Sequence, residues 1–160
     1  MGMIGHYLRI TPTELAALEA APETVVAFIY RDDTSERHLD IDKAWHAIHF
    51  LLNQDQYQAH ELLNIVFGGE ALGNADLGTG PARVIPAAEV AAMATVVRSI
   101  GVDELRARWD PVELQEHDIY PEIWDDGDDA LNYVLDNYAR LVDFFVAAAR
   151  DDDAIITYIA

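Results

Sequence analysis

Four residues in the first third of the chain have the types and spacing of a candidate metal or acid-base site. They are Asp42, Trp45, His46 and His49. On an α-helix these positions share one broad face, so a carboxylate and two imidazoles could converge there on a divalent cation. The two histidines, however, lack both the glutamate of a His-Glu-x-x-His zinc motif and an obvious third ligand. We therefore expect no metal site on this helix.

His49 admits two interpretations. In the first, Trp45 and His49 pack in the core or at the rim of a pocket, and the imidazole donates to a backbone carbonyl or a carboxylate. In the second, His49 is the general base of a small hydrolase or transferase, beside an orienting carboxylate. The residues that could share such a pocket with His49 are Asp40, Asp42, Glu70 and Tyr120. The first interpretation is favoured, because nothing in the sequence requires these side chains to meet.

A second candidate is the aromatic stretch from Tyr120 to Trp124, which is expected to be a loop between two helices. Exposed Tyr and Trp are well suited to anchor a protein partner, although the same residues can instead pack over the core. The acidic residues between Asp125 and Asp129 would add a rim suited to a basic ligand. They do not follow the alternating order of a calcium-binding loop, so calcium is not expected here.

Several other catalytic chemistries are excluded by residue type or motif. The chain has no cysteine, and its only serines, Ser35 and Ser99, lie outside any Gly-x-Ser-x-Gly sequence. The glycines from Gly68 to Gly73 lack the spacing of a dinucleotide fingerprint, and no lysine follows them as in a phosphate-binding loop. We therefore expect no cofactor and favour a non-enzymatic protein.

The charge of the chain restricts its partners. Its net charge is −19, from 29 acidic and 10 basic residues, and Lys43 is the only lysine. Such a surface repels polyanions, so neither nucleic acid nor an anionic membrane is an expected partner, whereas a basic protein would be attracted. The sequence has no basic leader, no long uncharged apolar run and no cysteine, which predicts a soluble cytoplasmic protein.

The two ends of the chain have the patterns of β-strands. Apolar residues alternate from Ile4 to Ile10, as in a strand with one buried face, and His6 lies on that face as a buried or edge histidine. The β-branched run from Ala154 to Ile159 predicts a closing strand. We expect both strands in one sheet, with a long helix from Asp128 to Arg150 packed across it.

Two helix starts carry one capping signature. Thr11-Pro12-Thr13-Glu14 and Asp110-Pro111-Val112-Glu113 each combine a capping side chain, a proline at the first helical position and a glutamate at the third. Further helices are expected at 42–53, capped by Asp42, at 86–100, ended by Gly101, and at 102–109. A strand is expected at 83–85 and a loop at 68–80, while 25–30 fits either a strand or a buried helix. The fold class is α+β, with a small sheet and several helices in a single domain over residues 1–160.

Several short segments together resemble a known family. They are Met1 to Gly5, Leu39 to Trp45, His49 to Leu52, Gly68 to Glu70, Gly80 to Arg83, Ile119 to Pro121, and Trp124. In this order and spacing they resemble the YfbM-like family over essentially the whole chain. The resemblance implies a bacterial domain of unknown function with an α+β fold and without an accepted activity, cofactor or set of catalytic residues. It also implies that Trp45 and His49 are family features, whereas His46 is a variation of this chain.

The favoured interpretation is an acidic, non-enzymatic interaction domain that binds a basic protein through aromatic and carboxylate side chains. The candidate surface comprises Asp40, Asp42, Trp45, His49, Glu70, Tyr120 and Trp124. The alternative is the small hydrolase or transferase with a pocket around His49. A pocket that holds three or more of these side chains would favour the enzyme, whereas a buried His49 would favour the binding domain.

Overall fold

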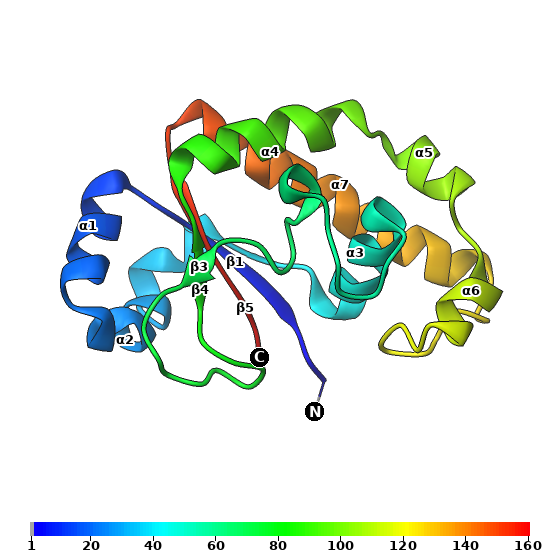
Figure 1. Cartoon of the computed structure of the whole chain (residues 1–160), viewed down its shortest axis with the longest axis horizontal. Helices are drawn as coiled ribbons and strands as arrows, with labels where there is room; N and C mark the ends of the chain where they lie inside the picture. The colour runs from blue at the N-terminus through cyan, green and yellow to red at the C-terminus, as the bar shows by residue number, and fades with distance from the viewer. Residues whose placement is uncertain (1) are drawn as a thin grey trace.

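The computed structural model describes residues 2–160 and contains a five-stranded antiparallel sheet with helices on both faces (Figure 1). The strand order is β2-β1-β5-β4-β3. The strands are β1 (Gly5–Ile10), β2 (His38–Asp40), β3 (Glu70–Ala71), β4 (Arg83–Ile85) and β5 (Ala154–Ile159). Strand β5 lies in the centre, paired with β1 on one side and β4 on the other. The predicted α+β class and the shared sheet of the terminal strands are confirmed.

Helices occupy most of the chain between the strands. The α-helices are α1 (Pro12–Ala20), α2 (Val25–Ile29), α3 (Trp45–Asn53), α4 (Ala87–Ser99), α5 (Val102–Ala107), α6 (Pro111–Glu116) and α7 (Asp128–Arg150). Short 3₁₀ helices are η1 (Pro22–Thr24), η2 (Asp32–Arg37), η3 (Asp42–Ala44) and η4 (Glu61–Leu63). In Figure 1, α1 and α2 lie to one side of the sheet, and α3 to α7 lie to the other.

The sheet separates two hydrophobic cores. Helices α3 to α7 enclose the larger core, whereas α1 and α2 cover the smaller one. Strand β1 contributes to both: Tyr7 lies in the larger core, and Leu8 and Ile10 lie in the smaller core. The sequence pattern predicted one buried face for this strand, which is wrong, because helices cover both faces of the sheet. His6 is half-buried at the margin of the smaller core.

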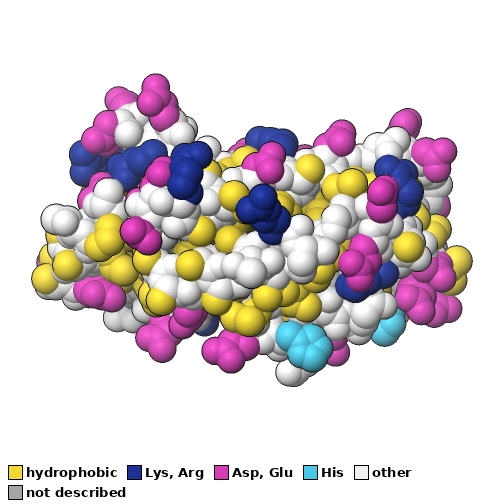
Figure 2. All heavy atoms as spheres, turned by 90° about the horizontal axis from the view of Figure 1, so that it is seen from above, with side chains coloured by type: hydrophobic (Ala, Val, Ile, Leu, Met, Phe, Trp, Pro, Cys, Tyr) yellow, Lys and Arg dark blue, Asp and Glu magenta, His cyan; other side chains and the backbone are white. Residues whose placement is uncertain are grey.

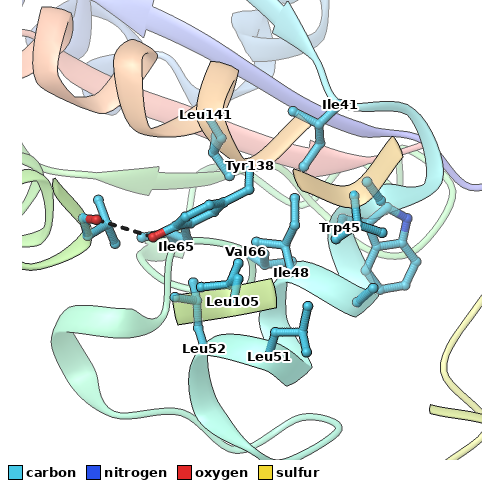
Figure 3. Close-up of a cluster of buried hydrophobic side chains, with 14 of the residues drawn as sticks. Ile41, Trp45, Ile48, Leu51, Leu52, Ile65, Val66, Leu105, Tyr138 and Leu141 are labelled. Carbon is cyan, nitrogen blue, oxygen red and sulfur yellow. Dashed lines mark hydrogen bonds between the residues drawn. The ribbon is translucent and has the colours of Figure 1, made fainter. Parts of the chain in front are cut away.

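Helix α7 packs across the sheet as predicted. The ring of Tyr7 on β1 meets the α7 rings of Phe144 and Phe145 edge-on, at centroid distances of 6.4 and 6.0 Å. Nearer the start of α7, the buried Tyr138 hydroxyl donates to the Val97 and Ile100 carbonyls at 3.1 and 2.7 Å. Figure 3 shows Tyr138 among the aliphatic side chains of the larger core. These contacts join α7 to the sheet and to α4.

The two predicted helix caps that precede a proline, at Thr11 and Asp110, are present. At the start of α1, the Glu14 amide donates to Thr11 Oγ1 at 3.2 Å, and the Thr11 amide donates to Glu14 Oε1 at 2.9 Å. At the start of α6, Asp110 Oδ1 accepts from the amides of Val112 and Glu113 at 3.0 and 3.4 Å. Each contact satisfies amides that the first helical turn leaves without a partner.

Three local predictions need correction or completion. Asp42 does not cap α3, because it lies in η3 with a φ of 48°, and its carboxylate accepts from the Tyr133 hydroxyl instead. Gly101 does not end α4, since that helix stops at Ser99 and Gly101 precedes α5 as its N-cap residue. The ambiguous run at 25–30 forms α2, because it covers the smaller core with Val25, Phe28 and Ile29.

The expected loop at 68–80 contains the short strand β3, which pairs with β4 at the edge of the sheet. None of the helices within residues 2–160 combines the length and apolar character needed to cross a membrane.

Candidate functional site

A hollow of about 230 Å³ lies on the larger-core side of the sheet, between α3, the segment that follows it, and the ends of β4 and β5. We call it the aromatic pocket. Its lining includes Trp45, Tyr57, Phe67, Pro81, Arg83 and Ile159. Trp45 is 6% exposed and Tyr57 is 66% exposed, so the first forms a buried wall and the second stands at the surface.

Aromatic contacts fix the shape of the pocket. Phe67 meets Trp45 edge-on, with centroids 5.9 Å apart, and lies 6.3 Å from the ring of Tyr57. The ring of Tyr120 stacks on Trp45 at 5.6 Å. Trp45 Nε1 donates to the Met3 carbonyl at 2.9 Å, so the polar atom of the indole is satisfied. These edge and stacked arrangements are the favoured ones for aromatic pairs.

His46 connects the pocket to its surroundings. Its Nε2 lies 3.1 Å from the Gln56 carbonyl, and its Nδ1 accepts from the Tyr120 amide at 3.0 Å. These two partners require the neutral tautomer with the proton on Nε2. The ring also stacks between Trp45 and Tyr57, at 4.9 and 5.5 Å. His46 therefore positions the aromatic rings and has no nitrogen free for a metal.

His49 has a similar supporting role one turn further along α3. Its side chain is fully buried, its Nε2 lies 3.1 Å from the Gln58 carbonyl, and its ring meets the edge of Phe67 at 4.7 Å. Burial lowers the pKa of His49 to about 4, although the Gln58 carbonyl acts in the opposite direction. A neutral Nε2–H donor matches the packed interpretation of this residue, since the imidazole has no exposure to a substrate.

The two imidazoles hold the segment on either side of Tyr57. His46 binds the carbonyl before it, at Gln56, and His49 binds the carbonyl after it, at Gln58. Asp55 Oδ1 accepts from the amides of Tyr57 and Gln58 at 2.9 and 2.8 Å, and these hydrogen bonds lower the pKa of Asp55. The exposed Tyr57 ring is therefore carried on a well-anchored turn.

Arg83 is the charged residue of the pocket wall. Its Nε donates to the Gly68 carbonyl at 3.2 Å, and its Nη2 donates to the Gly69 carbonyl. Gly69 has a φ of 81°, and a Cβ there would lie 2.3 Å from the Val84 carbonyl oxygen. A glycine is therefore required where this backbone approaches β4. Among residues 2–160, no acidic side chain lies within ion-pair distance of Arg83.

The structure separates the candidate residues that the sequence grouped together. Trp45 lines the aromatic pocket, and Tyr120 stacks on Trp45. His49 contacts the pocket residue Phe67 and the Gln58 carbonyl. The carboxylates of Asp40, Asp42 and Glu70 are exposed and do not line the aromatic pocket. Asp40 Oδ1 accepts from the Asp42 amide at 2.6 Å, and Asp42 Oδ2 accepts from the Tyr133 hydroxyl at 2.9 Å. Within residues 2–160, no three His, Asp or Glu side chains are placed to hold a metal ion.

Trp124 does not belong to a binding surface. It is fully buried, its Nε1 donates to the Ile119 carbonyl at 2.6 Å, and its ring meets Trp109 edge-on at 5.8 Å. The prediction that Trp124 belongs to the binding surface is therefore wrong, because its indole packs in the larger core and does not extend into solvent.

The sequence did not indicate Tyr57, Phe67 or Arg83 as site residues. Tyr57 is an isolated aromatic in a polar stretch, and Arg83 comes from a short buried strand. They meet only because β4 and the segment after α3 lie side by side at one end of the sheet. A large exposed aromatic between polar residues is the one local signal that the sequence offered for this pocket.

The fold and this pocket define a small α+β domain with an aromatic hollow beside a central C-terminal strand. The chain belongs to the family described as a domain of unknown function, DUF1877, whose sequence model matches residues 1–158. The predicted YfbM-like relationship is thereby confirmed.

A solved structure gives the same fold. The crystal structure of a protein of unknown function, YfbM from Escherichia coli, matches with a TM-score of 0.75 and 23% sequence identity. The match covers 99% of this chain and 100% of that chain. A comparison with functionally curated proteins finds no significant match.

Proposed function

We propose that this protein is a non-enzymatic interaction domain that binds a basic segment of a partner protein and holds one uncharged side chain of that segment in the aromatic pocket. The size of the pocket carries this proposal. At about 230 Å³ it is smaller than the roughly 300 to 1,000 Å³ of typical small-molecule sites, and it suits one inserted side chain. Buried aromatic walls beside an exposed ring are typical of the anchoring points of protein interfaces.

The charge of the molecule supports a basic partner. The chain carries 29 acidic and 10 basic residues, and five of its arginines already pair with carboxylates. Figure 2 shows acidic side chains spread over one face and around its rim, with Lys and Arg side chains interspersed among them. A potential of one sign steers partners of the opposite sign and raises their association rate.

Arg83 defines what enters the pocket. Its positive charge in the wall disfavours a lysine or arginine side chain inside. The aromatic and apolar side chains that form most of the lining favour an apolar or aromatic group. The basic residues of the partner then flank this anchor and face the acidic surface outside the pocket. Guanidinium donors that Gly68 and Gly69 do not use can hold a backbone carbonyl of the partner.

The hydrolase or transferase alternative receives less support. Its general base, His49, is buried and bonded to a backbone carbonyl, and the carboxylates of Asp40, Asp42 and Glu70 are exposed away from the pocket. A general base must reach the proton that it removes. The buried His49 therefore favours a binding domain over an enzyme, in the cytoplasmic setting that the sequence predicts.

The proposal predicts a definite peptide preference. On an array of lysine-rich peptides with one variable central residue, the chain should bind best when that residue is phenylalanine, tryptophan or leucine, and poorly when it is alanine or lysine. Replacing Tyr57 by Ala should weaken binding of the best peptide about tenfold, or about 1.4 kcal/mol, measured by calorimetry.

Tyr30 provides the matched control for this experiment. It is 63% exposed, close to the 66% of Tyr57, and it does not line the aromatic pocket. Tyr30→Ala should leave the affinity unchanged, and raising the salt concentration should weaken binding to both proteins. Equal affinities for the parent and Tyr57→Ala, or equal binding of a peptide with glutamates in place of the lysines, would contradict the proposal.

The same charge predicts no binding of nucleic acid. A net charge of −19 opposes the approach of phosphates, and Lys43 is the single lysine of the chain. In a gel-shift assay at physiological salt, neither DNA nor RNA should be retained by the protein. Micromolar affinity for either polymer would show that local geometry outweighs the net charge.

A further inference from the structure

A second hollow, of about 510 Å³, opens on the smaller-core side of the sheet. We call it the histidine pocket, and its lining includes His6, Tyr30, Asp32, Ser35, His38 and Tyr158. The aromatic pocket lies on the opposite face of the sheet. Two of its lining residues, Thr157 and Arg83, are in register with Tyr7, whose side chain lies in the larger core. The two hollows share one lining residue, Tyr158, and the proposed interaction function uses neither His6 nor His38.

The strand register brings ionisable groups together in and beside this pocket. Asp40 on β2 and Tyr158 on β5 lie directly opposite His6 on either side of β1. Directly opposed residues of an antiparallel pair point to the same face. His38 is the diagonal neighbour of His6, two positions along β2 from Asp40. The sheet therefore gathers two imidazoles, with a carboxylate beside them, from distant parts of the sequence.

The two imidazoles are in direct contact. Nδ1 of His6 lies 3.1 Å from Nε2 of His38, and the ring centroids are 5.1 Å apart. Tyr158 stacks on the other side of His6 with a centroid distance of 4.7 Å, which holds the His6 ring in this orientation. Both histidines are half-buried and line the hollow.

We propose that His6 and His38 bind one divalent transition-metal ion, with zinc as the reference ion, through the two nitrogens that now share a hydrogen bond. Imidazole binds zinc at about 2.0 to 2.1 Å with tetrahedral geometry, which places two ligand nitrogens about 3.3 to 3.4 Å apart. The observed separation of 3.1 Å needs an opening of only a few tenths of an ångström. The metal takes the place of the proton between the rings.

This is an open, exchangeable site and not a structural one. The side chains supply two ligands, since no three His, Asp or Glu side chains within the described residues 2–160 are arranged as a ligand set. Water fills the remaining positions from the hollow. Asp40, opposite His6, and Asp32 in the lining add negative charge near the cation, which lowers the energy of the bound state. Arg31, which also lines the hollow, is paired with Asp33. Imidazole ligands suit zinc, copper and nickel better than calcium or magnesium.

Calorimetric titration of the chelator-treated protein with zinc chloride at pH 7.5 tests the site. The parent should bind one zinc ion per chain. His38→Gln and His6→Gln should each weaken binding by at least about tenfold, since loss of even an outer-shell partner typically costs 10- to 100-fold. His60→Gln, which removes an exposed histidine outside both pockets, is the matched control and should bind zinc like the parent.

A thermal melt provides the second measurement. Zinc should raise the melting temperature of the parent and of His60→Gln, because a ligand of the native state stabilises it by mass action. It should not raise that of His6→Gln or His38→Gln, and the metal-free melts show whether each variant is folded. Zinc affinity that is the same in the parent and in both pocket variants would overturn the proposal. Peptide binding at the aromatic pocket should survive in His38→Gln, so the two proposals fail separately.

Discussion

Removing the last six residues, 155–160, should abolish cooperative unfolding of this protein. These residues form nearly all of β5, which is the central strand of the sheet and pairs with both β1 and β4. Ile155 and Ile156 are completely buried and point into the larger and the smaller core, respectively. Their loss therefore removes the shared wall of both cores and exposes β1 and β4 as unpaired edges.

The expected loss exceeds what the domain can tolerate. Burying one isoleucine side chain contributes about 1.5 to 3 kcal/mol, and a domain of this kind has a total stability of only about 5 to 15 kcal/mol. Two isoleucines, the Tyr158 ring and the backbone hydrogen bonds to two neighbouring strands together approach that total. The truncated chain should be insoluble or molten, with near-ultraviolet circular dichroism lost.

Two point variants test the same strand without shortening the chain. Ile156→Asp should unfold the protein, because it buries an unpaired carboxylate, whereas Val112→Asp should have little effect at a side chain that is 60% exposed. A truncated chain that keeps a sharp cooperative melt would show that β5 is not the central element that the sheet order indicates.

The elements that the sequence predicted correctly are those with a local signal. The bounds of β5 and α7 follow from a β-branched run and from an apolar stripe with helical spacing, and neither depends on distant residues. The caps at Thr11 and Asp110 are equally local, since side chain and amide lie within three residues of each other. Such features depend on neighbouring residues alone, so they can be predicted without knowing the tertiary packing.

The candidate site was less predictable because tertiary packing decides it. The helix face that carries Trp45 and His49 was identified, but the hydrogen-bond partner of His49 is the backbone carbonyl of Gln58 and not one of the carboxylates that the sequence made available. Backbone groups have no sequence signature, so this choice could not be read from residue types. The contact of His6 with His38 depends on the register of two strands and was also invisible in the sequence.

Two buried histidines on α3 hold the backbone that carries the exposed Tyr57 ring. His46 and His49 bind the carbonyls on either side of Tyr57, so the position of the surface tyrosine depends on two neutral imidazoles in the core. The backbone around Tyr57 is thus already ordered in the free protein, so less conformational entropy is lost when a partner binds. The aromatic pocket is therefore preorganised by residues that the partner does not touch.

Acidification should destabilise the protein through His49. Its pKa is 6.5 as a free side chain and about 4 in the folded protein, because burial disfavours the imidazolium. Between these values the unfolded chain binds more protons, so the free energy of unfolding falls as the pH drops through 6.5. The loss is complete near pH 4 and amounts to about 3 kcal/mol from this residue. Burial lowers the pKa of His6, His38 and His46 as well, so the total loss is larger.

Denaturant titrations at a series of pH values isolate the contribution of His49. In His49→Gln the free energy of unfolding should change less steeply between pH 6.5 and 4, by up to about 1.4 kcal/mol per pH unit relative to the parent. His60→Gln, which removes one exposed histidine, serves as the control for the loss of an imidazole. A slope unaltered by His49→Gln would mean that the buried imidazole does not titrate as its environment indicates.

The behaviour at neutral pH separates the packed role of His49 from a catalytic one. His49→Ala should lower stability at pH 7 by about 1 to 3 kcal/mol, through lost packing against Phe67 and an unpaired Gln58 carbonyl. Zinc bound between His6 and His38 should remain at one ion per chain in that variant, because the two sites share no residue. A residue retained for catalysis would instead be replaced at little cost or with a gain in stability. An unchanged melt in His49→Ala, together with loss of a stoichiometric zinc or manganese ion, would show that the packed interpretation is wrong and would favour an enzyme built around His49.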